Sequence, residues 1–513
     1  MSLGFGTSGV RGLVVELTDF ECALYTKAFL RHLKSRHMQG DAASNPKVLS
    51  ISGDFRSSTP RILRAVAFAA LSEGWAVDFC GRIPTPALAL HAMRKRQPSL
   101  MVTGSHIPDD RNGIKFNLPT GEILKEDEKG ISAAYLTLKE AVPADFASSF
   151  EPDGSLKPAF VPELGKGHAE AIADYRARYL DFFPRNFLSG RRIVLFEHSA
   201  VGREVLLELL TGFGAEVIRV GRSETFIPVD TEAVQNPEQL AQWVRESKAD
   251  ALITADGDSD RPLLVDELGN VVRGDVLGIL VAGFLRADAV AAPVSCNTAL
   301  EKSKLFPKVL RTKIGSPFVI AAMNEAIADG CRRVVGYEAN GGFLLATDLE
   351  GEDGRAGLVA LPTRDAVLPL FAALYQALRS GGPGALSALV AKLPQRFTHS
   401  GLLRQFPTEH GKAILSWIAK ASPMDHYREL AASFGNLVEL DFTDGARMTF
   451  DSNVVVHFRP SGNAPEFRCY TEDSSIDGAT KANDRALKVL RDSLLPVVLA
   501  AGATAKPGGP PPQ

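Results

Sequence analysis

"LMVTGSHIPDDRNGIKF", residues 100–116, joins a short apolar run to a loop crowded with polar and charged residues. The apolar run predicts a buried strand, and the loop follows at its carboxyl end, where open α/β sheets place their ligands. Ser105 and His106 stand at the start of this loop, and Lys115 follows a turn near its end. Two interpretations remain open: an ordinary turn, or a loop in which Ser105 is a nucleophile that handles phosphate.

Strand and helix patterns alternate on both sides of this loop, and the alternation starts again twice. Strand, helix and strand patterns occur over 47–80, 192–220 and 289–346. This order predicts parallel sheets covered by helices, in three similar α/β domains in tandem. Beyond residue 392 the pattern changes to antiparallel strands and then a helix, which indicates a C-terminal α+β domain. The strands are predicted over 447–450, 453–462 and 466–472, and the helix over about 476–498.

The domain boundaries are placed where the composition changes. A chain of 513 residues is too long for a single hydrophobic core. A Pro-, Gly- and charge-rich segment at 150–167 indicates the first linker. We expect α/β domains over 1–155, 156–288 and 289–393, an α+β domain over 394–500, and a disordered tail over 501–513.

The overall composition excludes several classes of protein. The net charge is −3, whereas a nucleic-acid-binding protein carries a basic surplus. Five cysteines are scattered without a CxxC pair, which indicates a reducing compartment with buried or free thiols rather than a disulfide framework or a zinc site. No apolar run is long enough to span a bilayer, and no secretory signal opens the chain, so we expect a cytoplasmic protein with no membrane partner.

The segment ADGDSDR, residues 255–261, carries three aspartates after a predicted strand. Asp256, Asp258 and Asp260 repel one another on so short a loop unless a hard cation lies among them. Oxygen ligands of this kind suit Mg²⁺, which commonly shares its shell with a phosphate oxygen. Arg261 is then placed to hold a substrate phosphate or hydroxyl. The alternative is a solvated acidic turn; a calcium loop does not fit the spacing.

Two Gly-rich segments are weaker candidates. In GYEANGGF (336–343), Glu338 and Asn340 are suited to hydrogen-bond sugar hydroxyls, although a plain turn is the stronger interpretation of that segment alone. The segment GFGTSGVRG (4–12) has two interpretations: a flexible clamp that brings Arg11 to an anion, or simply an ordered terminus.

The segment RPSGNAPEF (459–467) also follows a predicted strand. Arg459 can bind phosphate through its forked guanidinium, and Ser461, the backbone around Gly462, and Asn463 can complete a cradle. A hairpin turn is the alternative. Taken together, the loops form one coherent site: a nucleophilic serine, a metal triad, a sugar-binding loop and a phosphate cradle, on four domains that face one cleft.

These segments resemble the signatures of the α-D-phosphohexomutase family over about residues 4–475. TGSHIPDDRNGIKF is similar to its phosphoserine loop, DGDSDR to its Mg²⁺ loop, YEANGG to its sugar loop and RPSGNAPE to its phosphate loop. Lesser similarities lie in SGDFRSSTP (52–60), IPTPAL (83–88) and RTKIGSPFV (311–319). The resemblance implies three similar α/β domains and a fourth domain related to the TATA-binding-protein fold, arranged as a heart around a central cleft. It implies a small-molecule hexose phosphate substrate and a monomer or dimer.

The resemblance also implies a mechanism. A phosphoserine at Ser105 would contribute to binding Mg²⁺ with the three aspartates, and its phosphate would pass to a hexose phosphate. The resulting hexose 1,6-bisphosphate, the intermediate and activator, would turn over and return its other phosphate to Ser105. Lys115 and Arg11 would steady the moving phosphoryl group, and Arg459 would hold the phosphate that does not react. Whether His106 is the general base or positions the loop is open.

The sugar is left open by departures from the family pattern. Asn340, Ser316 and Asn463 replace the residues that are usual at these positions, and Phe343 stands where His is common. We expect phosphomannomutase activity, with phosphoglucomutase or dual activity as the alternative, and amino-sugar mutases as less favoured. A phosphatase with Asp256 as covalent nucleophile, or an inactive sugar-phosphate sensor, are the rivals from other classes.

Overall fold

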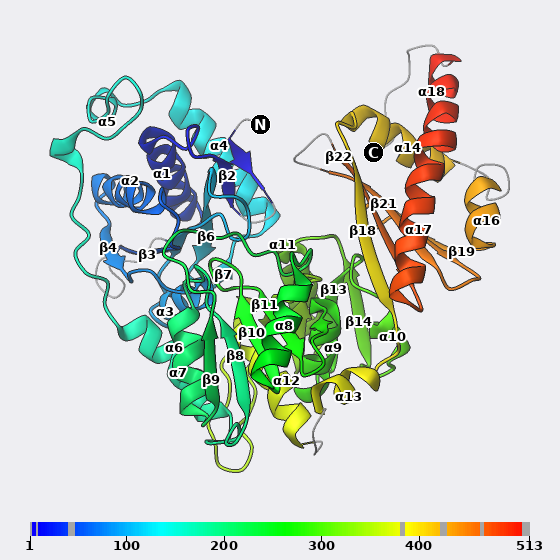
Figure 1. Ribbon diagram of the computed structural model, residues 1–513. Helices are drawn as coiled ribbons and strands as arrows, with labels where there is room; N and C mark the ends of the chain where they lie inside the picture. Colours follow the sequence, from blue (N-terminus) through cyan, green and yellow to red (C-terminus); the bar gives the residue numbers. More distant parts are fainter. Residues whose placement is uncertain are drawn as a thin grey trace.

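The computed structural model describes residues 3–6, 9–38, 47–379, 385–420, 428–461 and 466–504. Figure 1 shows four domains. The first, in blue and cyan, and the fourth, in orange and red, lie at the upper left and upper right, with two central domains in green and yellow-green below and between them. Three α/β domains and a C-terminal α+β domain were expected, and this architecture is confirmed.

The first domain is built on a mixed sheet with the strand order β1-β2-β6-β5-β3-β4, in which β7 pairs with β6. Its strands are β1 (Gly4–Phe5), β2 (Val10–Leu13), β3 (Val48–Gly53), β4 (Ala76–Phe79), β5 (Ser99–Val102), β6 (Arg111–Leu118) and β7 (Gly121–Glu122). Its helices are α1 (Asp19–Ser35), α2 (Thr59–Ser72), α3 (Thr85–Arg94), α4 (Lys125–Glu140) and the short α5 (Ala144–Ala147).

The second sheet has the order β12-β11-β10-β8-β9, and the third has the order β14-β13-β15-β16-β17. The second domain contains α6 (Glu170–Phe182), β8 (Arg192–Phe196), α7 (Arg203–Gly212), β9 (Glu216–Val220), α8 (Pro237–Ser247), β10 (Ala251–Ala255), β11 (Pro262–Asp266) and β12 (Val271–Val272). Then follow α9 (Gly274–Phe284), β13 (Ala289–Pro293), α10 (Ala299–Lys302), β14 (Lys308–Thr312), α11 (Ser316–Ala328), β15 (Val334–Tyr337), β16 (Phe343–Leu345), β17 (Leu361–Asp365) and α12 (Val367–Arg379).

The three sheets repeat one plan, which differs in one respect from the parallel sheets that we expected. In each, three parallel strands are followed by a strand that returns antiparallel: β6 beside β5, β11 beside β10, and β16 beside β15. The serine, metal and sugar loops connect these pairs. Loops this short cannot make the crossover that a parallel neighbour requires, so only a hairpin is possible. Each sheet is therefore mixed, with the expected parallel strands joined by an antiparallel one.

The fourth domain contains an antiparallel sheet in the order β18-β22-β21-β20-β19. The elements after α12 are α13 (Ala385–Ala391), β18 (Phe397–Arg404), α14 (Thr408–Lys420), α16 (Arg428–Phe434), β19 (Leu437–Asp441), β20 (Ala446–Phe450), β21 (Val455–Pro460), β22 (Glu466–Asp473), α17 (Ile476–Val489), a π-helical turn (Leu490–Leu494) and α18 (Leu495–Thr504). We expected a disordered tail from residue 501, but α18 continues to Thr504, because Ala and Leu dominate this segment and favour helix. Residues 505–513 lie outside the described part.

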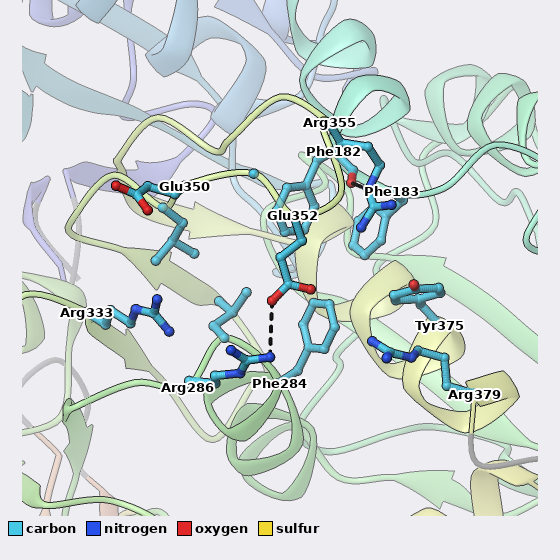
Figure 2. Close-up of a pocket in the computed structure, with 13 residues that line it drawn as sticks. Phe182, Phe183, Phe284, Arg286, Arg333, Glu350, Glu352, Arg355, Tyr375 and Arg379 are labelled. Carbon is cyan, nitrogen blue, oxygen red and sulfur yellow. Dashed lines mark hydrogen bonds and ion pairs between the residues drawn. The ribbon is translucent and has the colours of Figure 1, made fainter.

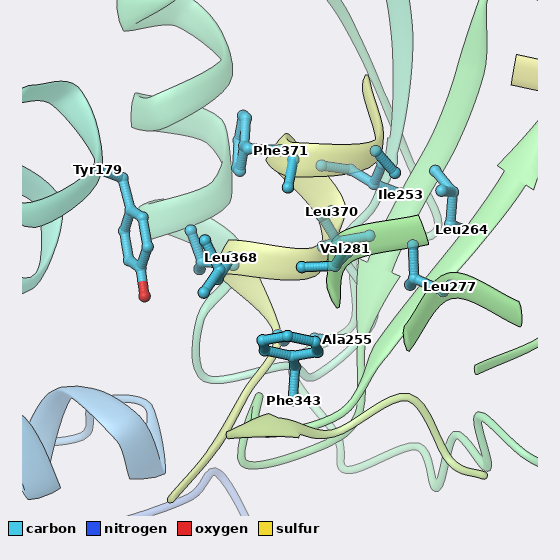
Figure 3. Close-up of a cluster of buried hydrophobic side chains, with 14 of the residues drawn as sticks. Tyr179, Ile253, Ala255, Leu264, Leu277, Val281, Phe343, Leu368, Leu370 and Phe371 are labelled. Carbon is cyan, nitrogen blue, oxygen red and sulfur yellow. The ribbon is translucent and has the colours of Figure 1, made fainter. Parts of the chain in front are cut away.

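The hydrophobic cores show how the domains are joined. The second and third domains share one core, to which α3 of the first domain also contributes. In it, Leu370 and Phe371 of α12 pack near Ile253 of β10 and Val281 of α9 (Figure 3). The first domain has a further core between its sheet and α1 and α2, and the fourth domain has its own. The fourth domain is therefore the most independent of the four. No helix of the described residues is long and apolar enough to cross a membrane.

Candidate active site

Ser105 lies fully buried at the point where the first and second domains meet. Its backbone has a φ of 56°, in the left-handed region that residues with side chains seldom adopt. Its amide donates to Thr103 Oγ1 at 2.8 Å, and its hydroxyl donates to Asp256 Oδ2 at 2.5 Å. The loop thus holds the serine hydroxyl against the metal loop of the neighbouring domain.

Arg56 holds the serine loop in this shape, and the sequence analysis did not single it out. Its guanidinium is fully buried and forms an ion pair with Asp54 at 3.2 Å. It also donates to the backbone carbonyls of Ser105, Ile107, Pro108 and Arg111. A Cβ at Gly104 would lie 2.6 Å from the guanidinium carbon, so Arg56 leaves no room for a side chain at that position. The segment SGDFRSSTP, which echoes the family pattern, was the available signal.

The metal loop places Asp256, Asp258 and Asp260 together, each fully buried. One oxygen from each lies within 4.8 Å of the others. Burial raises the pKa of Asp256 well above its ordinary value, and the charges of Asp258 and Asp260 raise it further. Asp258 Oδ1 and Asp260 Oδ1 are buried without a hydrogen-bond partner in the described part of the chain. Three mutually repelling carboxylates with unused buried oxygens fit a divalent metal ion.

Cations surround this triad. Lys115 Nζ lies 2.6 Å from Asp258 Oδ2 and 2.5 Å from Asp260 Oδ2. Arg364 Nε lies 3.1 Å from Asp260 Oδ2. Burial opposes ionisation of Asp260, but Arg364 and Lys115 overcome it and hold the pKa of this carboxyl below its ordinary range. Asp260 therefore remains ionised, and the positive charges of Lys115 and Arg364 lie beside the triad.

His106, Arg261 and Arg11 lie beside the serine and the triad. Arg261 Nη1 is 2.6 Å from His106 Nδ1, and Ser105 Oγ is 3.4 Å from the same atom. Burial, reinforced by Arg261, lowers the pKa of His106 to about 2, so the imidazole is neutral. Burial and the neighbouring Arg261 and Arg364 also lower the pKa of Arg11 to about 10. Arg11 Nε and Nη2 have no hydrogen-bond partner within the described ranges, which suits a group that binds an anion.

The sugar loop is joined to the triad through Arg364. Glu338 Oε2 lies 3.1 Å from Arg364 Nη1, and the same nitrogen donates to Ser316 Oγ at 3.1 Å. Ser316 in turn donates to Glu122 Oε2 at 2.7 Å. Asn340 instead stabilises the turn, because its Oδ1 accepts a hydrogen bond from the Gly342 amide at 3.0 Å. Glu338 is thus near the triad, whereas Asn340 Oδ1 already serves the loop itself.

The phosphate loop is placed differently from the other three. Arg459 Nε lies 3.0 Å from Asp444 Oδ2, and that oxygen also accepts the Ile314 amide of the third domain at 2.9 Å. Ser461 is buried, and its amide donates to the Glu466 carbonyl at 2.9 Å. Gly462 and Asn463 lie outside the described residues. Arg459 is therefore held at the boundary between the third and fourth domains, and within the described residues it forms no hydrogen bond or ion pair with the triad.

Thr85 is a further site residue that the sequence analysis missed. It begins α3, its hydroxyl donates to Asp258 Oδ2 at 2.5 Å, and its amide donates to the Asp258 carbonyl at 3.0 Å. The preceding Pro84 and the following Pro86 fix the start of the helix next to the metal loop. The segment IPTPAL, another echo of the family pattern, was the available signal for Thr85; none was available for Arg364.

A pocket of about 250 Å³ lies away from this site. Figure 2 shows Phe182, Phe284, Arg286 and Tyr375 along it, with Arg286 paired to Glu352. None of the predicted site residues lines this pocket, so the pocket is not part of the candidate active site.

Comparison with known proteins matches most of the chain. Family models described as phosphoglucomutase/phosphomannomutase, alpha/beta/alpha domains I, II and III match residues 2–142, 173–269 and 273–397. The third match begins at residue 273, just before α9. From the sequence we placed the boundary between the second and third domains later, after residue 288.

Relatives match almost end to end. A phosphomannomutase of Sinorhizobium fredii is 43% identical, over 96% of this chain and 99% of the relative. A phosphomannomutase of Salmonella muenchen is 38% identical, over 96% of each. A crystal structure of a phosphoglucomutase/phosphomannomutase family protein from Burkholderia thailandensis superposes with a TM-score of 0.69 at 19% identity, covering 98% of each chain, which shows the same fold.

Proposed function

The chain belongs to the phosphoglucomutase/phosphomannomutase family, and on that premise we propose that it is a phosphomannomutase, an isomerase that interconverts mannose 6-phosphate and mannose 1-phosphate. The observation that carries the proposal is the Ser105 hydroxyl, buried and 2.5 Å from the carboxylate of Asp256 in a triad suited to a divalent cation. The identity of the sugar is supported by the two phosphomannomutases at 43% and 38% identity over nearly the whole chain.

In the proposed reaction, the active enzyme carries a phosphoryl group on Ser105. A sugar hydroxyl oxygen attacks the phosphorus, the bond from phosphorus to Ser105 Oγ breaks, and the hydroxyl proton leaves to a base. The hexose 1,6-bisphosphate then turns over, and its other phosphate returns to Ser105. Such transfer depends mainly on alignment and neutralisation of charge, which supports a role for Lys115 and Arg11 at the moving phosphoryl group.

The cation that fits the site best is Mg²⁺, because its donors are all oxygens. Asp256, Asp258, Asp260 and the phosphoserine would hold it. When bound, it would withdraw charge from the phosphoryl group. The two buried oxygens of Asp258 and Asp260 that lack partners support this assignment.

Glu338 is the residue that we assign to the sugar hydroxyls, because it is buried beside Arg364 and Arg364 contacts Asp260. Arg459, with Ser461, Gly462 and Asn463, is assigned to the phosphate that does not react. Arg261 is assigned to substrate binding beside His106. For His106, the neutral imidazole and its short contact with Arg261 favour a positioning role over general base.

The test of the function is a coupled assay that compares mannose 1-phosphate with glucose 1-phosphate, each with a catalytic amount of its 1,6-bisphosphate as activator. The proposal predicts a higher kcat/KM for mannose 1-phosphate and no net release of inorganic phosphate. A preference for glucose 1-phosphate would make the protein a phosphoglucomutase of the same mechanism. Net release of phosphate without isomerised sugar would instead indicate a phosphatase and refute the mutase proposal.

A further inference from the structure

Four side chains outside the candidate active site have the composition of a zinc site. They are Asp78 in β4, Cys80 just after it, His91 in α3 and His168 in the linker before α6. One ligand atom from each lies within 4.8 Å of the others. This set is called the quartet below.

The side chains of the quartet gather around the Asp78 carboxylate. His91 Nε2 lies 2.9 Å from Asp78 Oδ2, and His168 Nε2 lies 2.7 Å from Asp78 Oδ1. Cys80 Sγ lies 3.8 Å from His168 Nε2. In a tetrahedral zinc site with ordinary bond lengths, neighbouring ligand atoms are about 3.2–3.7 Å apart. The three distances above lie within about half an ångström of this range, and all four ligand atoms lie within 4.8 Å of one another, so side-chain rotations can bring them onto one ion.

The backbone around the quartet is arranged to bring these groups together. Asp78 and Cys80 are two residues apart, the spacing at which an extended chain projects side chains to one side. A Cβ added to Gly167 would lie 2.2 Å from the Cα of Gly81, so the linker backbone packs directly on the chain beside Cys80. This close approach, which a larger residue would prevent, delivers His168 to the quartet.

Charge and burial favour a divalent metal at this position. Cys80 and His91 are each 1% exposed. A thiolate and a carboxylate balance the two positive charges of the ion, while two neutral imidazoles add none, so the site has no net charge to bury. Without a metal, the Asp78 carboxylate is shared between both imidazoles, and the Cys80 thiol has only long contacts, at 3.7 Å to the Asp78 carbonyl and 3.8 Å to His168.

We propose that the quartet binds one Zn²⁺ ion as a structural site that joins the first domain to the linker. Sulfur and imidazole ligands select zinc over the Mg²⁺ expected at the aspartate triad. Four protein ligands leave no open position for substrate, which assigns the site a structural role. The ion would hold both α3 and the linker, and α3 begins at Thr85, which contacts Asp258 of the metal loop. A zinc site was not predicted from the cysteine spacing, because three of these four ligands are not cysteines.

The first test uses Co²⁺ as a coloured substitute for Zn²⁺. The full-length protein is stripped with a strong chelator, and Co²⁺ is added under reducing conditions. The proposal predicts the visible bands of tetrahedral Co²⁺ together with a thiolate-to-metal charge-transfer band, saturating at one ion per chain and displaced by Zn²⁺ but not by excess Mg²⁺. No charge-transfer band in the wild-type protein would overturn it.

Variants decide which residues bind the ion. Cys80→Ser should abolish the charge-transfer band, and His168→Gln, a change at a partly exposed side chain on the linker, should weaken Zn²⁺ binding by more than about tenfold, the least that loss of a supporting residue costs at a metal site. The matched controls, Cys331→Ser and His37→Gln, lie elsewhere and should bind as the wild type does. Asp258→Asn should retain the bands. Bands that survive in both quartet variants, or vanish in Asp258→Asn, would refute the quartet as the site.

Thermal unfolding shows whether the bound ion stabilises the fold, as a structural ion must. Zn²⁺ should raise the midpoint of thermal unfolding of the stripped wild-type protein and of Cys331→Ser, because an ion that binds only the folded state stabilises it. It should leave the midpoint of His168→Gln much less affected. Equal shifts in the wild type and His168→Gln would contradict the proposed structural role.

Discussion

At Ser105 the backbone adopts a left-handed conformation that costs a residue with a side chain about 1–2 kcal/mol. Arg56 offsets this cost, because its buried guanidinium binds four carbonyls of the same loop.

Sequence alone was sufficient to find Ser105, Lys115 and the aspartates, which cluster along short segments. It was not sufficient to find Arg56 or Arg364, since each reaches the site from another element and only the tertiary structure brings it there.

We expect Arg56→Lys to lower kcat, because a lysine cannot bind the four loop carbonyls at once and Ser105 then loses its alignment. Leaving buried carbonyls unsatisfied should also lower the free energy of unfolding by about 1–3 kcal/mol. The measurements are steady-state kinetics and thermal unfolding, with Arg64→Lys on the exposed side of α2 as the control. Unchanged kcat in Arg56→Lys would show that the loop holds its shape without Arg56.

Removing Mg²⁺ should abolish activity, and returning it should restore activity. Asp258→Asn should weaken Mg²⁺ binding and lower kcat by roughly 10–100-fold, because it removes one charge from the proposed cation site. Asp110→Asn, at an exposed position of the serine loop, is the matched control. Full activity in the chelated, metal-free protein would refute the metal role.

At the scale of the elements, all three site loops of the α/β domains are hairpin loops. Their strands were predictable from apolar runs such as 192–196 and 251–255, which became β8 and β10. The antiparallel return was not, since β11 and β16 are as apolar as parallel strands and periodicity does not reveal direction. The hairpins matter because each loop then projects from the same edge of its sheet.

Gly257 lies where two of these loops touch. A Cβ there would lie 2.8 Å from the Ser105 carbonyl oxygen and 2.7 Å from the ring of Phe226. Gly257→Ala should therefore push the serine and metal loops apart and lower kcat/KM by about tenfold to a hundredfold. Gly283→Ala, in α9, where a Cβ would meet only the Leu305 side chain at an ordinary contact distance of 3.8 Å, should leave kinetics unchanged and slightly raise stability. Equal kinetics in the two variants would contradict close contact between the loops.

At the scale of the whole molecule, the second and third domains share a core, and the fourth has its own. Sequence patterns do not reveal a shared core, because α12 looks like any amphipathic helix until its partner in the second domain is known. The fourth domain contacts the third through polar contacts, such as the Ile314 amide to Asp444 and the Thr298 amide and hydroxyl to Glu472. We infer that it moves when substrate binds, and that Arg459 then exchanges Asp444 for the substrate phosphate.

Arg459→Ala should raise KM and also lower kcat, each by about tenfold or more, the cost of a lost charge-assisted hydrogen bond that also aligns the substrate. Arg404→Ala, exposed on the same domain, is the control. Small-angle scattering should show a smaller radius of gyration when mannose 1-phosphate is added to the wild type. Unchanged scattering, together with unchanged kinetics in Arg459→Ala, would leave the fourth domain as a rigid part of the fold.

In the proposed mechanism, Ser105 carries the phosphoryl group. The most direct test is to incubate the protein with mannose 1,6-bisphosphate, remove the sugar, and locate the phosphoryl group by peptide mass spectrometry. The account predicts phosphate on the peptide that contains Ser105, its loss when mannose 6-phosphate is added, and mutase activity lower by orders of magnitude in Ser105→Ala but not in Ser57→Ala, an exposed serine beside the same loop. Phosphate on another residue, or near-wild-type activity in Ser105→Ala, would contradict it.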